Sequence, residues 1–286
     1  MFAVFLTAFA SCTDTIDVEM KNNGKLITID AFLTTLRQDQ RIRLTYTDNY
    51  FSGMTPPSVT GATVILKDLG TNRIVHFADN GNGNYIYRLS GDDTLIHANH
   101  SYELTVKCNG YEYFAAASCY RSPAIDDVYF EYKSASGGSG GESKGGNVLM
   151  LRAKDAVGPV PDFYWIKSFK NGRFYNRPEN IRLEYFGFNN ELDGGYFNPD
   201  VWSTSGPGGS LDPCISGDVA RIEIHGISRE VLEFLNLGKQ MSNNGGLFAT
   251  TPVNLPTNIF PSDKSYPRAV GMFSISEVSF KELVSQ

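Results

Sequence analysis

Apolar and polar residues alternate along the first third of the chain, and this pattern predicts short β-strands. From Arg41 to Thr47 the alternation is strict, so Ile42, Leu44 and Tyr46 share one face. Asn109-Gly110 separates two further runs and is the strongest hairpin signal in the chain. The expected strands are 27–33, 41–47, 62–69, 74–78, 85–89, 101–107 and 111–118. Seven short strands at this spacing are typical of an immunoglobulin-like β-sandwich, which we predict over residues 25–121.

The pattern changes at Pro123, and residues 122–286 are predicted to form a second β-rich domain with one short helix. The Gly/Ser tract at 134–146 has no side chains to bury, which indicates a flexible hairpin loop or a linker. Longer and more aromatic strands are expected at 163–169, 182–188 and 219–225, with further strands at 125–132 and 269–274. A helix is predicted near 228–243, because Ser228 can cap it. Its apolar stripe consists of Val231, Leu232, Leu235 and Leu237.

The N-terminus predicts a secreted, lipid-anchored protein. Residues 1–11 are an apolar run that suits a signal peptide, and small residues precede Cys12. This arrangement resembles the lipobox of bacterial lipoproteins, in which a cysteine accepts diacylglycerol. Phe9 replaces the commoner Leu, and no Lys or Arg precedes the apolar run. Residues 12–24 are then a lipidated, mildly acidic tether. The less favoured alternative is that the apolar run is a buried strand that contains Cys12.

Composition and charge limit the classes of partner. The chain has 286 residues with 41% hydrophobic and 20% charged residues, which describes a globular protein able to bury a core. A formal charge of −6 argues against nucleic acid or an anionic membrane surface as a partner. Cys108 and Cys119 are expected to be too far apart for a disulfide, at the turn and at the far end of one hairpin. With Cys214 they are expected to be packed free thiols.

Residues that could bind metal are present, but they do not form a known motif. His97 and His100 form an HxxH in a turn-rich stretch, where a solvated loop is a better interpretation than zinc. Asp79 and Asp193 lie in Gly-rich acidic stretches that could hold calcium, although neither stretch has the twelve-residue loop spacing. No metal site or cofactor is therefore predicted. The sequence has no GxSxG, HExxH or triad-like motif, and no catalytic residue is assigned.

Aromatic residues are dense between positions 164 and 202. Many of them are expected to fill a sandwich core. Those near turns are harder to bury together and are the candidate binding residues, because exposed aromatics often mark contacts with glycans, peptides or proteins. These candidates are Phe174, Tyr175, Tyr196, Phe197 and Trp202.

A series of spaced motifs resembles an uncharacterised family of Bacteroidota outer-membrane lipoproteins, known as a domain of unknown function. Besides Cys12, the motifs are Val59-Thr60-Gly61-Ala62-Thr63-Val64, Gly81-Asn82-Gly83-Asn84-Tyr85, Pro123-Ala124-Ile125-Asp126-Asp127-Val128, Pro161-Asp162-Phe163-Tyr164-Trp165, Glu191-Leu192-Asp193-Gly194, Ile227-Ser228-Arg229-Glu230, Pro256-Thr257-Asn258-Ile259 and Val270-Gly271-Met272-Phe273. Members of this family are often encoded beside TonB-dependent receptors. The resemblance implies an accessory or ligand-presenting lipoprotein that works with an outer-membrane transporter.

Three functional hypotheses follow. The leading one is a non-catalytic binding partner of a TonB-dependent transporter, on the cell surface or facing the periplasm. The second is a structural or adhesion-like envelope lipoprotein that contacts other proteins. The third is a carbohydrate-active or peptidase module, whose paired carboxylates would come from residues distant in the sequence.

Overall fold

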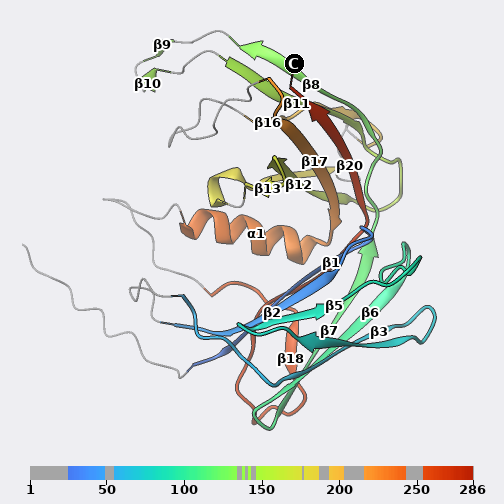
Figure 1. Cartoon of the computed structure of the whole chain (residues 1–286), viewed down its shortest axis with the longest axis vertical. Helices are drawn as coiled ribbons and strands as arrows, with labels where there is room; N and C mark the ends of the chain where they lie inside the picture. The colour runs from blue at the N-terminus through green and yellow to red at the C-terminus, as the bar shows by residue number, and fades with distance from the viewer. Residues whose placement is uncertain are drawn as a thin grey trace, which may run out of the picture.

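The computed structural model describes residues 25–48, 55–133, 137–138, 141–142, 146–175, 177–186, 193–202, 216–242 and 254–285. The described chain is mainly β and forms two stacked units with a helix beside their junction (Figure 1). We call the unit at the bottom of Figure 1 the barrel and the unit at the top the upper sandwich. The mainly β class with one α-helix is therefore confirmed for the described residues.

The seven strands predicted in the first third are all present. They are β1 (Ile27–Thr34), β2 (Gln40–Tyr46), β3 (Thr63–Asp68), β4 (Ile74–Asp79), β5 (Asn84–Tyr87), β6 (Ser101–Cys108) and β7 (Tyr111–Tyr120). The β6–β7 hairpin turns at Asn109 and Gly110, which both have positive φ, at 50° and 79°. Cys108 and Cys119 lie at opposite ends of this hairpin as buried free thiols, as predicted.

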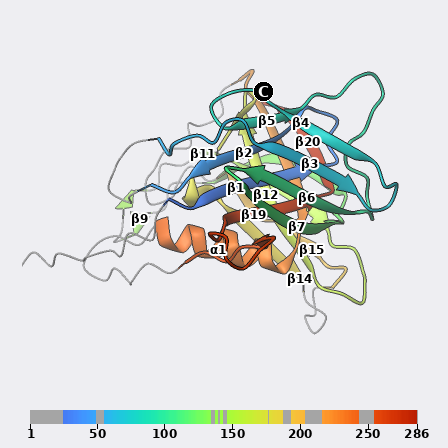
Figure 2. The same cartoon turned by 90° about the horizontal axis from the view of Figure 1, so that it is seen from below.

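Two C-terminal strands belong to the barrel, and this corrects the predicted domain division. β19 (Val270–Ser276) lies between β1 and β7 and is parallel to both. The strands form a closed ring of eight in the order β7-β19-β1-β2-β5-β4-β3-β6, with β6 pairing β7 again (Figure 2). β18 (Ile259–Pro261) pairs the outer part of β7. Residues 25–121 are thus not a self-contained sandwich, because Phe273 and Ile275 of β19 complete their core.

The upper sandwich is made of two antiparallel sheets. The first contains β8 (Ile125–Lys133), β11 (Gly146–Lys154), β15 (Tyr196–Phe197) and β16 (Asp200–Trp202), and β8 and β11 pair antiparallel. The second contains β12 (Asp162–Lys170), β13 (Arg173–Phe174), β14 (Arg182–Phe186), β17 (Val219–Ile227) and β20 (Val278–Val284). Smaller elements are β9 (Gly137–Gly138), β10 (Gly141–Glu142) and the 3-10 helix η1 (Pro178–Asn180). The core between the sheets includes Leu149, Leu151, Tyr164, Ile166, Ile222 and Ile224.

The predicted helix is present as α1 (Arg229–Ser242) and packs at the junction of the two units. The Ser228 hydroxyl caps it by accepting a hydrogen bond from the Val231 amide at 3.2 Å. Val231 and Leu235 are buried on its inner face, against Met272 of β19. The helix therefore covers the apolar part of the boundary between the barrel and the upper sandwich.

Two connections cross side by side from the barrel to the upper sandwich. One joins β7 to β8, and the other joins β19 to β20 through Glu277. The Glu277 amide donates to the Tyr120 carbonyl at 2.9 Å, and the Ser122 hydroxyl donates to the Ile224 carbonyl of β17 at 2.7 Å. Arg121 adds an ion pair with Asp162 of β12. These bonds hold the paired crossing against the upper sandwich.

Gly226 of β17 is required where the crossing passes over the strand. A Cβ at this position would lie 2.1 Å from the Arg121 carbonyl oxygen and 2.4 Å from that of Tyr120. Backbone atoms cannot move aside as a flexible side chain can. Only the absence of a side chain allows this approach.

We predict that Gly226→Ala destabilises the protein by about 1–3 kcal/mol, the usual cost of forcing an extra group into a packed site. Urea unfolding followed by circular dichroism measures the change. Gly238→Ala is the matched control, because a Cβ there meets nothing within 4 Å. In the helix this control is expected to stabilise by up to about 1 kcal/mol. Equal effects of the two variants would contradict the steric argument.

A buried polar pair lies on the face of β17 that is directed toward the barrel. His225 is 3% exposed, and its Nε2 lies 2.9 Å from Glu223 Oε2. Burial, together with the nearby Lys167 ammonium, lowers the pKa of His225 to about 4. The pair is close to the Phe32–Trp165 contact between β1 and β12, whose ring centroids are 5.6 Å apart.

We predict that stability falls as the pH drops from about 6.5 towards 4. In this range His225 binds a proton in the unfolded chain but not in the folded chain. The stabilising contribution of neutral, buried His225 is therefore fully present above pH 6.5. At pH 5 the free energy of unfolding is expected to be about 2 kcal/mol lower because of this group. His225→Gln keeps an amide donor for Glu223 without titrating, so its unfolding free energy is expected to change less between neutral pH and about pH 5. Identical pH profiles for both proteins would contradict this.

Candidate ligand pocket

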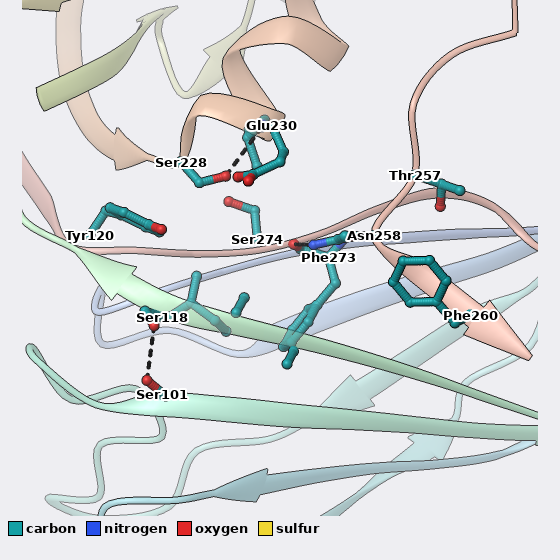
Figure 3. Close-up of a pocket in the computed structure, with 14 residues that line it drawn as sticks. Ser101, Ser118, Tyr120, Ser228, Glu230, Thr257, Asn258, Phe260, Phe273 and Ser274 are labelled. Atoms are coloured by element: carbon teal, nitrogen blue, oxygen red, sulfur yellow. Dashed lines mark hydrogen bonds between the residues drawn. The ribbon is translucent and has the colours of Figure 1, made fainter. Parts of the chain in front are cut away.

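A pocket of about 520 Å³ lies between the outer face of the barrel and the first turn of α1. Its lining comes from β6, β7, β18, β19, α1 and the segment that leads into β18 (Figure 3). These elements come from the N-terminal and the C-terminal parts of the chain. The pocket therefore exists only when β18 and β19 have joined the barrel.

The pocket coincides with a gap beside β7. The β18 ladder on β7 extends only to Ala115, and the β19 ladder begins at Cys119. Among the described residues no strand pairs Ala116 or Ser118 on that side. Successive residues of a strand direct their backbone groups to opposite sides. The Cys119 amide donates to the His100 carbonyl on the side of β6, whereas the Tyr120 carbonyl accepts from the Glu277 amide on the opposite side. Ala116 and Ser118 are four and two residues before Tyr120, so their backbone groups point to the same side as those of Tyr120 and face the gap.

Asn258 takes the place of a partner strand along β19. Its Nδ2 donates to the Phe273 carbonyl at 2.7 Å, and its Oδ1 accepts from the Phe273 amide at 2.9 Å. Both polar groups of this side-chain amide are thus engaged by backbone. Asn258 shapes the wall of the pocket and leaves other groups to contact a ligand.

Three polar groups in the lining have no hydrogen-bond partner within the described part of the chain. They are the Glu230 carboxylate, the Tyr120 hydroxyl and the Ser274 hydroxyl. Figure 3 shows the oxygens of Glu230 and Ser274 directed toward each other across the space below α1. Burial raises the pKa of Tyr120, and the charge of Glu230 adds to this, so the phenol stays protonated and can donate. Among the described residues of the lining, Glu230 has the sole charged side chain.

Aromatic rings lie at the two ends of the pocket. Phe260 is 63% exposed at one end, opposite Phe114 on β7, and Tyr120 is 41% exposed at the other. The floor between them consists of small residues, including Ala116 and Ser118. This arrangement suits a neutral or cationic organic ligand that has hydroxyl or amino groups and a flat apolar face.

The aromatic residues singled out from the sequence lie on separate surfaces. Phe197 is 9% exposed and packs parallel to Tyr164 in the core of the upper sandwich, because neighbouring residues of a strand point to opposite faces. Its assignment as an exposed binding residue was therefore wrong. Tyr196 is 50% exposed beneath the Arg152 guanidinium, 4.7 Å from the ring centroid. Phe174 packs on Phe169, and Tyr175 is partly buried against the core. The side chain of Trp202 lies outside the described residues.

The four weak metal candidates have other roles in the structure. Both carboxylate oxygens of Asp79 accept backbone amides, those of Gly61 at 2.7 Å and Gly81 at 2.8 Å. Asp193 accepts from the Gly158 amide. His100 pairs with Asp68 at 2.9 Å, and its ring centroid is 5.2 Å from that of His97. The described residues contain no group of three or more His, Cys, Asp or Glu side chains that could hold a metal ion.

No pattern in the sequence indicated this pocket. Glu230 follows the capping Ser228 in the first turn of the helix, where acidic residues are common, and Phe260 is a lone aromatic in a Pro-rich stretch. Tyr120 lies at the end of β7 and Ser274 lies in β19, and no sequence pattern indicated that these two strands pair with each other. Cys12 and Cys214 lie outside the described residues.

Comparison with known proteins identifies the family. Residues 13–282 match the Domain of unknown function (DUF4249), and the chain belongs to this family. No curated protein matches the chain. Among solved structures, the crystal structure of chicken CNTN1 FN1-FN3 domains has 11% sequence identity and a TM-score of 0.23. The match covers 69% of this chain and 59% of that chain, and a TM-score this low carries no argument about fold or function.

We predict that Asn258→Ala destabilises the protein by about 1–3 kcal/mol, because it leaves the Phe273 amide and carbonyl without their partner. Thermal or urea unfolding measures the loss. Asn254→Ala is the control, since Asn254 makes one contact of 3.4 Å with Arg268 at the surface. That control is expected to change stability by less than about 0.5 kcal/mol. A neutral Asn258→Ala would show that Asn258 does not replace a strand.

Proposed function

We propose that this protein is a lipid-anchored, non-catalytic binding protein of the bacterial outer membrane, and that it presents a ligand to a TonB-dependent transporter. The observation that carries the binding part of the proposal is the pocket between β7, β19 and α1. Its unengaged oxygens and exposed aromatic rings are suited to binding, and the described residues of its lining include one carboxylate. Glycoside hydrolysis usually requires two.

The sequence supports the anchor and the partner. The apolar run before Cys12 supports lipidation, and the family match begins at the following residue. No helix in the described part of the chain is long and apolar enough to span a membrane. The resemblance to Bacteroidota lipoproteins encoded beside TonB-dependent receptors supports the transporter partner.

The polar groups of the pocket support a specific chemical class of ligand. Glu230 can only accept hydrogen bonds when ionised, whereas the Tyr120 and Ser274 hydroxyls can donate or accept. An anionic ligand would meet the charge of Glu230 and is disfavoured. A neutral hydroxylated ligand, or one with an amino group, satisfies all three positions while its apolar face packs on Phe260.

We predict that the tagged, lipidated protein, purified from its own membrane with detergent, retains a TonB-dependent transporter that mass spectrometry identifies. The double variant Tyr120→Ala/Phe260→Ala is expected to lose ligand that copurifies with the wild type. The matched control is Phe280→Ala, which removes a 48% exposed ring from β20, away from the pocket. Failure to recover any transporter would exclude the partnership, and unchanged ligand content in the double variant would exclude the pocket.

A further inference from the structure

Exposed aromatic side chains gather at one end of the barrel. Tyr111 follows the β6–β7 turn and is 38% exposed, and its ring meets that of Tyr266 at a centroid distance of 5.1 Å. On the outer face nearby, Phe114 is 41% exposed and lies opposite Phe260. We call these four residues the aromatic end. Exposed apolar surface of this kind usually marks an interaction site.

The described chain begins at the same end of the barrel. The Leu26 amide donates to Thr47 Oγ1 at 3.0 Å, and the Thr47 amide donates back to the Leu26 carbonyl. The neighbouring Tyr46 hydroxyl accepts a hydrogen bond from the side chain of Asn109, in the turn that precedes Tyr111. The start of β1 and the aromatic end therefore lie together at the lower end of the molecule in Figure 1.

We propose that the aromatic end lies against the lipid surface to which Cys12 is anchored. This inference rests on the lipid anchor of the proposed function. Lys25 follows Cys12 by thirteen residues, and such a tether can reach at most about 45 Å when fully extended. The anchor thus limits the distance between this end of the barrel and the bilayer to that reach.

The chemistry of the surface fits the headgroup region of a bilayer. Tyrosine is enriched at membrane–water interfaces, because its ring is apolar and its hydroxyl stays hydrated. Charges at this end have both signs, with Lys25 and Lys264 beside Asp48 and Asp263. The contact therefore depends on aromatic rings and does not require anionic lipids.

This orientation has a consequence for the ligand pocket. Phe260 belongs to the aromatic end and lines the pocket, so this end of the pocket faces the bilayer. Tyr120 is six residues from Phe114 along β7, which places it about 20 Å further from the turn. The upper sandwich, with the exposed Tyr196, then projects away from the lipid.

The test uses tryptophan as a depth probe. Tyr111→Trp is prepared in the chain from Cys12 with an N-terminal polyhistidine tag, and is bound to phosphatidylcholine vesicles that contain a nickel-chelating lipid and brominated acyl chains. Tyr185→Trp is the matched control, because Tyr185 is 60% exposed on β14 of the upper sandwich. After subtraction of the wild-type signal, quenching of the Tyr111→Trp fluorescence is expected to be at least about twofold stronger than that of the control.

Three outcomes are distinguished. Stronger quenching at position 111 supports the contact. Equal or weaker quenching at position 111 overturns it. A blue shift of that fluorescence without quenching also overturns it, and points to contact with a second copy of the chain. Circular dichroism confirms that both variants are folded.

The tag separates this inference from the anchor on which it rests. Because the tag recruits the chain to vesicles without lipidation, the quenching reports only on the orientation of the barrel. The mass of the N-terminal peptide from protein expressed in its native host reports on Cys12 itself. An unmodified Cys12 would reject the anchor of the proposed function, whatever the quenching shows.

Discussion

The structure depends on the position of β19 between β1 and β7. Without this strand the ring of strands is open between β1 and β7, and the barrel core lacks Phe273 and Ile275. The close pairing requires Gly271, which has a φ of 105° and whose absent Cβ would lie 2.1 Å from the Ile29 carbonyl oxygen. Since β19 continues directly into β20, the same strand also binds the upper sandwich to the barrel. The two units therefore form one structure through a shared C-terminal segment.

The pocket follows from the same constraint. β7 pairs with β18 near the turn and with β19 near the crossing, and no other described residue pairs the stretch of β7 between these two ladders on that side. Where a sheet has such a gap, backbone amides and carbonyls need hydrogen-bond partners other than a strand. The Asn258 side chain supplies both partners for the backbone of Phe273. The backbone of Ala116 and Ser118 then remains directed at the space beneath α1. The site is thus a consequence of how the barrel closes.

The junction between the units combines apolar packing with buried charge. Met272, Val231 and Leu235 form its apolar part, and α1 covers it. Beside them, Glu223 satisfies the His225 imidazole and the Arg221 guanidinium, at 2.9 and 2.8 Å. Polar groups at such a position are stable only in one arrangement, because each must keep its partner when water is excluded. This holds the barrel-facing side of β17 in one arrangement beside the apolar part of the junction.

The sequence by itself determined the local elements of this protein and the family to which it belongs. Strict alternation predicted β2, the Asn109-Gly110 pair predicted the β6–β7 hairpin, and Ser228 predicted the start of α1. These features depend on neighbouring residues, so a single sequence contains them. Only the tertiary structure decided that residues 270–276 close a barrel begun at residue 27, because strand pairing across such a distance leaves no periodic signal. For the same reason Tyr120, Glu230, Phe260 and Ser274 form one pocket that no local pattern could predict.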